Sequence, residues 1–199
     1  MPGLPGREKG RDTIDQGGIM NNFSRVIWIT GLSGSGKTTI ANEVVSRLRS
    51  SGQAVVMLDG DLMREVFGVG AATDKNHGRE GRLALAKQYA NLCRVIAAQG
   101  FIVVIATISM FREVHIWNRS NLPGYFEMYL KVPLEELRRR DPKGIYSRYD
   151  AGELNCVAGL DLQVDEPNEA EWIVEFEPER SVESIAKELI NRLNERQEI

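Results

Sequence analysis

The chain has 199 residues, of which 42% are apolar and 27% are charged, enough for one globular domain with a buried core. Lysine and arginine together number 25 and acidic residues 28, so the formal net charge is −3. That balance argues against a general binder of nucleic acid or of membrane surfaces. Any anionic ligand must therefore be held by a local site.

The N-terminal stretch and the cysteines point to no targeting segment or metal site. Residues 1–24 lack the apolar core of a secretory signal, and we expect a disordered extension before a single domain at 25–199. No apolar run approaches the roughly 20 residues that a membrane-spanning helix needs. Cys93 and Cys156 lack metal-ligand spacing and further partners, so we interpret both as reduced thiols.

Short apolar runs alternate with helical patterns along the chain. Strands are predicted at residues 26–30, 54–58, 101–108, 126–131 and 172–175. Helices are predicted at residues 39–49, about 79–98, 133–140 and 182–196. The alternation predicts an α/β fold, a three-layer α/β/α sandwich whose five-stranded, mostly parallel sheet is covered on both faces. Ligands of such sheets lie beyond the carboxyl ends of the strands.

The first strand leads into a phosphate-binding loop. Residues 31–38 fit G-x-x-x-x-G-K-[ST] at every fixed position, between a strand and a helix, which argues against a chance glycine-rich turn. We expect Lys37 to reach the outer phosphates of ATP and Thr38 to offer its hydroxyl to Mg²⁺. The motif predicts the P-loop NTPase type of fold, but alone it does not separate a kinase from a GTPase switch or a motor. The predicted ATP contacts are Gly31, Leu32, Ser33, Gly34, Ser35, Gly36, Lys37, Thr38 and Thr39.

Two carboxylates and an arginine follow the second strand. Phosphoryl transfer needs one group that orients or deprotonates the acceptor hydroxyl and another in the Mg²⁺ shell, roles that Asp59 and Asp61 would divide. Arg64 suits an anionic acceptor, because a guanidinium matches phosphate or sulfate oxygens bidentately. The alternative is a solvated turn in which Asp61 caps the next helix.

Further acceptor contacts are expected after the third strand and at the start of the long helix. Ile108 and Ser109 end that strand, where backbone groups and the serine hydroxyl would meet the acceptor. For Arg79 and Arg82 an exposed helical face and an anion-binding role both stay open.

The least regular part of the chain predicts a lid over residues of about 138–167. It begins with a basic run at 138–143 that ends at Lys143. A nucleic-acid patch is the alternative, and the acidic balance of the chain argues against it. Residues of this kind suit a lid that closes over ATP and excludes water.

Together these motifs resemble the adenylylsulfate kinase family, whose members transfer the γ-phosphate of ATP to the 3′-hydroxyl of adenosine 5′-phosphosulfate. The resemblance covers nearly all of residues 25–193. It rests on the stretches 28–39, 58–61 with Arg64, 108–112 and 140–146.

The resemblance implies roles for single residues and an assembly. By it Asp61 is the general base, Asp59 and Arg64 contact acceptor or metal, Ser109 is the serine sometimes given a phosphoenzyme role, and Lys143 belongs to the lid. It also implies a cytoplasmic homodimer. The predicted catalytic residues are Lys37, Asp61 and Ser109. The predicted acceptor contacts are Asp59, Asp61, Arg64, Arg82, Ile108, Ser109 and Lys143.

The acceptor side departs from the family pattern. Where the family has Phe-Ser-x-x-Asp-Arg-x-Glu-Asn-Ile-Arg-Arg, residues 75–83 read Lys-Asn-His-Gly-Arg-Glu-Gly-Arg-Leu, with Arg82 in place of the first arginine. The aromatic residue that stacks on the acceptor adenine is here Val157, and the proline of the Ile-Ser-Pro turn is Met110. Losing a stacking platform removes about 1 to 3 kcal/mol, unless Phe67 or Phe111 compensates.

Three functions stay open, with phosphorylation of adenosine 5′-phosphosulfate as the leading hypothesis. Residues 106–111 and 117–119 also resemble kinases of surface-polysaccharide pathways, including one that acts on cytidine diphosphoramidate, and the altered acceptor side favours that alternative. A nucleotide-dependent switch is a distant third, because the chain has no Asn-Lys-x-Asp guanine signature.

Overall fold

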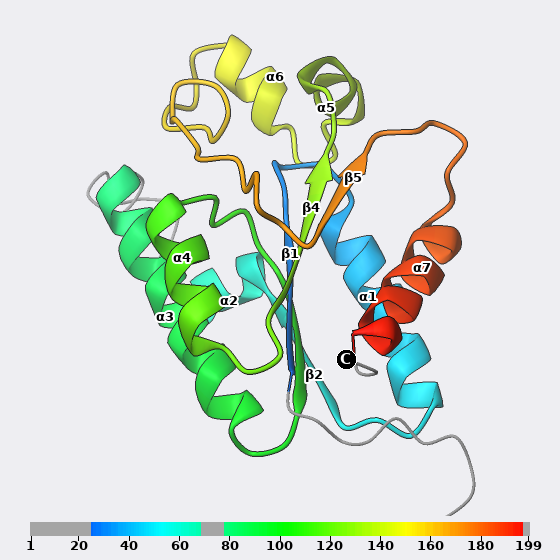
Figure 1. Ribbon diagram of the computed structural model, residues 1–199. Coiled ribbons are helices and arrows are strands. Elements are labelled where there is room, and N and C mark those ends of the chain that lie inside the picture. Colours follow the sequence, from blue (N-terminus) through cyan, green and yellow to red (C-terminus); the bar gives the residue numbers. More distant parts are fainter. Residues whose placement is uncertain (1–24, 69–77, 197–199) are drawn as a thin grey trace, which may run out of the picture.

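The computed structural model describes residues 25–68 and 78–196 (Figure 1). The disorder expected for residues 1–24 and the first part of the divergent segment at 75–83 lie outside these ranges. The strands are β1 (Arg25–Thr30), β2 (Val55–Asp59), β3 (Ile102–Ala106), β4 (Phe126–Lys131) and β5 (Trp172–Glu175). The helices are α1 (Lys37–Ser50), α2 (Gly60–Val66), α3 (Arg79–Ala97), α4 (Arg112–Asn121), α5 (Leu134–Arg140), α6 (Ile145–Asp150) and α7 (Val182–Glu195).

The five strands form one sheet in the order β2-β3-β1-β4-β5, and every pair is parallel, so the sheet is wholly rather than mostly parallel. The predicted third strand is too long at its end. Thr107 N still donates to Ile29 O at 3.0 Å, but Ser109 has φ 29, and the chain turns away from the sheet there. The turn aims the β3–α4 loop across the carboxyl edge of the sheet.

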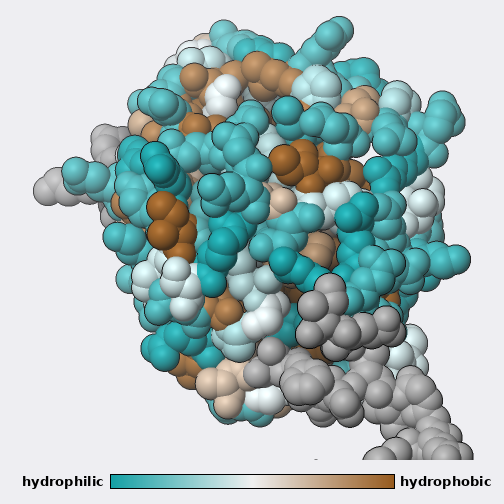
Figure 2. Space-filling model, viewed as in Figure 1, coloured by the Kyte–Doolittle hydropathy of each residue, from teal (hydrophilic) through white to brown (hydrophobic). Residues whose placement is uncertain are grey.

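Apolar layers cover both faces of the sheet, which confirms the predicted three-layer fold. Successive residues of β1 face opposite sides: Ile27 and Ile29 pack with α1 and α7, whereas Val26 and Trp28 pack with α3 and α4. All four have no exposed surface, which is why the strand reads as a continuous apolar run. The face seen in Figure 2 is mostly hydrophilic, with apolar residues in small groups.

Three helices were not predicted, for different reasons. Helix α4 has His115 and Asn118 among its buried residues, so its inner face shows no apolar period. Helices α2 and α6 have seven and six residues, too few for a periodic pattern to emerge. Among the residues described, no helix is long and apolar enough to cross a membrane.

The carboxyl ends of β1, β2 and β3 lie at one edge of the sheet, as parallel strands require. Helices α5 and α6 and the irregular chain that follows them lie over this edge (Figure 1). The predicted phosphate loop, acceptor loops and lid therefore meet in one region.

Candidate active site

A cavity of about 540 Å³ lies at this edge of the sheet. Its walls come from the phosphate loop, the start of α2, the first half of α3, the β3–α4 loop and the segment 140–164. The predicted ATP contacts that line it are Ser33, Gly34, Gly36, Lys37, Thr38 and Thr39. The predicted acceptor contacts that line it are Asp59, Asp61, Arg64, Arg82, Ile108, Ser109 and Lys143, the complete predicted set.

The phosphate loop has the tight geometry that its glycines predict. Gly31 has φ 150, and a Cβ there would lie 2.7 Å from Leu130 O and 2.8 Å from Ser35 Oγ, so only glycine fits. Gly36 precedes α1 in the left-handed region and aligns the start of that helix with the cavity. The loop thus turns its backbone toward the space where phosphates would lie.

Lys37 bends back over the loop. Its Nζ donates to Leu32 O at 2.7 Å and lies 3.5 Å from Ser35 Oγ. The pKa of Lys37 is lowered to about 8, chiefly by burial and also by the positive charge of Lys143, while Asp61 and Asp59 act in the opposite direction. A negatively charged phosphate beside Nζ would favour the ammonium form.

Asp59 joins the phosphate loop to the start of α2. Its Oδ2 accepts from Thr38 Oγ1 at 2.7 Å, and its Oδ1 accepts from the backbone N of Asp61 and Leu62 at 2.9 and 3.4 Å. Asp59, and not Asp61, is therefore the N-cap of α2, so the alternative role proposed for Asp61 is wrong.

Asp61 directs its carboxylate across the cavity. The side chain is 64% exposed, and its Oδ2 is paired with Nζ of Lys143 from the turn between α5 and α6. The general-base candidate and the lid lysine, 82 residues apart in sequence, therefore meet directly.

Two arginines form a positively charged part of the wall. Arg64 of α2 and Arg82 of α3 both line the cavity, and Arg82 Nη2 donates to Cys156 O at 2.7 Å. Burial lowers the pKa of Arg82, and the nearby positive charge of Arg64 lowers it further. Two like charges held together in this way favour an anion between them.

The end of β3 packs closely on the start of α2. A Cβ on Gly60 would lie 3.1 Å from Ala106 O, so glycine allows this approach. Ser109 is 7% exposed, and its hydroxyl lies 2.8 Å from Thr107 Oγ1. Ile108 O accepts a hydrogen bond from Thr30 Oγ1, which fixes the loop to β1.

The wall expected to meet the acceptor base is aliphatic on two sides. Val157 and Met110 both line the cavity and are nearly buried. Of the two aromatic residues suggested as substitutes, Phe111 lines the cavity, whereas Phe67 packs against Tyr89 with ring centroids 5.9 Å apart. Arg79 does not line the cavity.

Several residues of the site escaped the sequence analysis. Tyr89 lines the cavity and its hydroxyl donates to Gly60 O at 3.2 Å, while burial raises the pKa of Tyr89 to about 12, so the phenol keeps its proton. The carboxylate of Asp161 accepts from the backbone N of Cys156 and Val157 at 2.7 and 2.6 Å. No local pattern marks either residue, because each acts through folded contacts.

The segment after β4 is bound to the phosphate loop. Tyr146 is 1% exposed, and its hydroxyl donates to Ser33 O at 2.9 Å. Arg140 Nη1 donates to Gly34 O at 3.4 Å, and the Arg140 guanidinium lies over the Phe176 ring at 4.9 Å. Tyr146 belongs to the stretch 140–146 that carried the family resemblance.

A family profile described as adenylylsulphate kinase matches residues 23–175. The chain belongs to this family. Among curated relatives, the cytidine diphosphoramidate kinase of Campylobacter jejuni is 35% identical over 174 residues, which span 87% of this chain and 99% of that protein. The adenylyl-sulfate kinase of a Picosynechococcus species is 34% identical over 173 residues, 85% of this chain and 96% of that protein.

A solved structure of the same family matches the fold. The APS kinase of Mycobacterium tuberculosis, determined in complex with AMPPNP and APS, is 29% identical, with a TM-score of 0.76 over 85% of this chain and 97% of that one. With the phosphate loop, these likenesses identify an ATP-dependent kinase of the adenylylsulfate kinase type. The acceptors named for these relatives differ. The acceptor of this enzyme therefore has to be inferred from the residues of its own cavity.

Proposed function

We propose that this kinase transfers the γ-phosphate of ATP to a hydroxyl of a nucleotide-linked anion, and that cytidine diphosphoramidate is that acceptor. The observation that carries the proposal is Val157, an aliphatic side chain where the family pattern has a ring that stacks on adenine. A small pyrimidine base gains less from a stacking platform than a purine does, so it loses less in an aliphatic pocket. Support also comes from the Campylobacter relative, which aligns over 99% of its length.

Adenosine 5′-phosphosulfate is the second candidate acceptor. The family profile and the Picosynechococcus relative favour it. Arg64 and Arg82 do not discriminate, because guanidinium groups pair with sulfate and phosphate oxygens alike. The choice therefore depends on the base and on the walls that surround it.

In this proposal the phosphate loop and Lys37 hold the transferring phosphoryl group. Backbone N–H groups at the start of α1 would face its oxygens, and the Lys37 ammonium would stabilise the charge that develops on them. Lys37 Nζ is already at the loop, bonded to Leu32 O, and would exchange this carbonyl for a phosphate oxygen.

The residues present fit a magnesium ion at Thr38 and Asp59. The hydroxyl and the carboxylate lie 2.7 Å apart, and the described residues contain no cluster of three or more His, Cys, Asp or Glu that would form an all-protein cage. Mg²⁺ is commonly held by one or two carboxylates together with substrate phosphates and water. When bound, it would neutralise charge on the β- and γ-phosphates.

Asp61 is the proposed base. The acceptor hydroxyl oxygen forms a bond to the γ-phosphorus, the bond from that phosphorus to the β–γ bridging oxygen breaks, and the hydroxyl proton passes to the Asp61 carboxylate. Lys143, now paired with Asp61, would move to the phosphates as they enter. Ser109 stays a predicted contact, since its nearly buried hydroxyl, bonded with Thr107, suits holding the loop better than accepting phosphate.

We extend the proposal to the organisation of the protein. Residues 25–199 would form one kinase domain in which the segment of about 138–167 closes as a lid, and the enzyme would work as a cytoplasmic homodimer. The anchors at Tyr146 and Arg140 support a lid that closes on the phosphate loop.

The test is to identify the product by mass spectrometry. Purified enzyme is incubated with ATP, Mg²⁺ and either cytidine diphosphoramidate or adenosine 5′-phosphosulfate, with GTP in place of ATP as a control. We expect cytidine diphosphoramidate to gain one phosphate while ATP becomes ADP. Phosphorylation of adenosine 5′-phosphosulfate alone would reject the proposed acceptor, and ADP formation without any phosphorylated acceptor would reject kinase activity on both.

A further inference from the structure

Asp165 lies where the irregular chain over the cavity returns to the body of the protein, and it bonds to three separate places. Its backbone N donates to Met110 O at 2.9 Å. Its Oδ2 accepts from Arg112 N at 3.0 Å and from Arg79 Nη2 at 3.1 Å. Its carbonyl oxygen lies 3.3 Å from His115 Nε2. One residue thus ties the β3–α4 loop, the first turn of α3 and helix α4 together.

The partners of Asp165 lie beside the acceptor wall. Met110 lines the cavity, and so does Phe111, the residue between Met110 and Arg112. The Arg79 guanidinium lies 5.4 Å from the centre of the Phe111 ring. In the sequence, Asp165 directly follows Val164, which also lines the cavity. Asp165 therefore connects the two opposed sides of the wall, residues 157–164 and residues 110–111.

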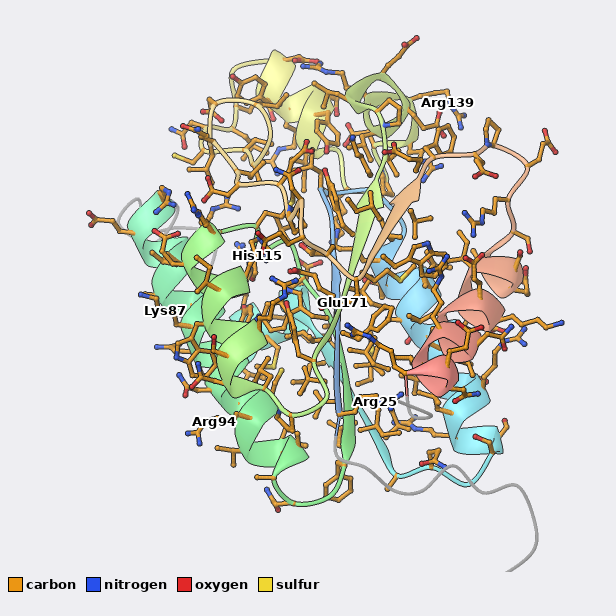
Figure 3. The ribbon with its side chains drawn as sticks, in the orientation of Figure 1. Arg25, Lys87, Arg94, His115, Arg139 and Glu171 are labelled. Carbon is orange, nitrogen blue, oxygen red and sulfur yellow. The ribbon has the colours of Figure 1, made fainter. Side chains whose placement is uncertain are left out.

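His115 gives this connection a rigid base. Its Nδ1 lies 2.5 Å from Oε1 of Glu127, which has no exposed surface, and the other carboxylate oxygen of Glu127 accepts from Arg119 at 3.1 Å. The backbone N of Glu127 donates to Glu171 at 2.7 Å. His115 and Glu171 lie toward the middle of the molecule in Figure 3, whereas Lys87 and Arg94 lie on the outer face of α3. Asp165 is thus fixed through His115 to a buried polar network, and its carboxylate also pairs with the exposed side chain of Arg79.

We infer that Asp165 is a positioning residue for the acceptor, which sets the separation between the aliphatic wall at 157–164 and the Met110–Phe111 loop. It touches no reacting group. Its test through the KM for the acceptor rests on the proposed function. Arg79 lies on an exposed face of α3, which is one of the two roles left open from the sequence, and the inference adds to it the role of partner to Asp165.

The test uses Asp165→Ala and the milder Asp165→Asn, whose amide oxygen still accepts from Arg112 N. Loss of a charged hydrogen bond of this kind predicts an acceptor KM raised about tenfold in Asp165→Ala and less in Asp165→Asn. The KM for ATP and kcat at saturating acceptor should stay within about twofold, since a positioning loss of this sort removes binding shared by ground and transition states. The control is Glu113→Gln, which removes the other carboxylate on Arg79, 3.0 Å away, without touching the wall.

A second readout does not depend on the acceptor. Cys156 is half-buried in the wall and Cys93 is buried, so the rate at which a thiol reagent labels Cys156 in the folded protein reports how firmly the wall is held. We expect faster labelling of Cys156 in both Asp165 variants and an unchanged rate in Glu113→Gln.

The two readouts separate this inference from the proposed function. Faster labelling of Cys156 with no phosphorylation of either acceptor by wild type would reject the function and keep the anchoring role. The inference would be overturned if Cys156 were labelled at the wild-type rate in Asp165→Asn. It would also be overturned if the KM for ATP rose as much as the KM for the acceptor. Because Asp165→Asn keeps the size and most hydrogen bonds of the residue, it decides the case even if Asp165→Ala unfolds.

Discussion

The phosphate half and the acceptor half of the cavity are built in opposite ways. The phosphate half is one contiguous stretch whose main internal contact, Lys37 with Leu32, spans five residues. The acceptor half is assembled from distant segments: 74 residues separate Arg82 from Cys156 and 82 separate Asp61 from Lys143. Behind its wall, 86 residues separate Arg79 from Asp165. A substitution in the dispersed half can therefore change the acceptor while phosphate handling stays intact.

Disabling the phosphate half should cost the enzyme the most activity. Lys37→Ala should reduce kcat/KM on the order of 10³-fold with any acceptor, because it removes charge stabilisation from the transferring group. Steady-state ADP release measures the loss, with an unchanged circular dichroism spectrum as the check on folding. Lys87→Ala, which removes the same charge from the exposed outer face of α3, should keep wild-type activity. Wild-type turnover by Lys37→Ala would refute the assignment of the phosphate loop.

The next variant changes Asp61, which is proposed to act where the phosphate half and the acceptor half meet. Asp61→Asn should lower kcat by about 10²-fold or more and leave the KM for ATP nearly unchanged, since in the proposed mechanism the carboxylate takes the acceptor proton rather than binding the nucleotide. Full steady-state kinetics in both substrates separates the two constants. Glu65→Gln, an exposed carboxylate on the same helix, is the matched control. An unchanged kcat in Asp61→Asn would leave the residue only its ion pair with Lys143.

A third variant tests the wall of the acceptor half that is proposed to face the base. Val157→Phe restores an aromatic side chain to the wall and should shift the ratio of kcat/KM values toward adenosine 5′-phosphosulfate by about tenfold. The ratio for two acceptors in one enzyme preparation cancels any loss of active protein. Val157→Leu, which stays aliphatic, should keep the wild-type ratio. A ratio that is the same in Val157→Phe and wild type would show that this wall does not contact the base.

The smallest expected effect is a proton taken up on nucleotide binding. Burial holds the pKa of Lys37 at about 8, below its usual value, and a bound phosphate should raise the pKa again. Above pH 8 the free enzyme has lost this proton, so binding of AMPPNP should take up roughly one proton at pH 9 and almost none at pH 7. Calorimetry in buffers of different ionisation enthalpy measures the uptake. Lys37→Arg, which stays charged at both pH values, should show none at pH 9.

Much of the fold could be predicted from the sequence because buried parallel strands read as apolar runs. β4 (Phe126–Lys131) and β5 (Trp172–Glu175) have the predicted bounds, and α3 (Arg79–Ala97) ends one residue early. Helix α4 could not be predicted, since the residues that bury its inner face include His115 and Asn118. The face that this helix buries is set by a buried polar network that forms only after folding.

How well the sequence predicts the site also differs between the phosphate half and the acceptor half. The predicted acceptor residues lie in one cavity because strand ends of a parallel sheet converge, a rule that sequence can exploit. The cap of α2 was expected two residues too late, because Asp59 and Asp61 are both suitable N-cap residues. The roles of Asp161 and Asp165 could not be predicted, because each depends on backbone groups placed by folding. Local motifs predict phosphate chemistry, whereas the residues proposed to select the acceptor are brought together by contacts between distant segments.

The proposed preference of this kinase for a cytidine-linked substrate depends on its aliphatic acceptor wall. The most direct test is the ratio of kcat/KM for cytidine diphosphoramidate to that for adenosine 5′-phosphosulfate, measured in parallel with wild-type enzyme at saturating ATP and Mg²⁺. We expect a ratio well above one. A ratio below one would contradict this preference and would return the enzyme to adenosine 5′-phosphosulfate.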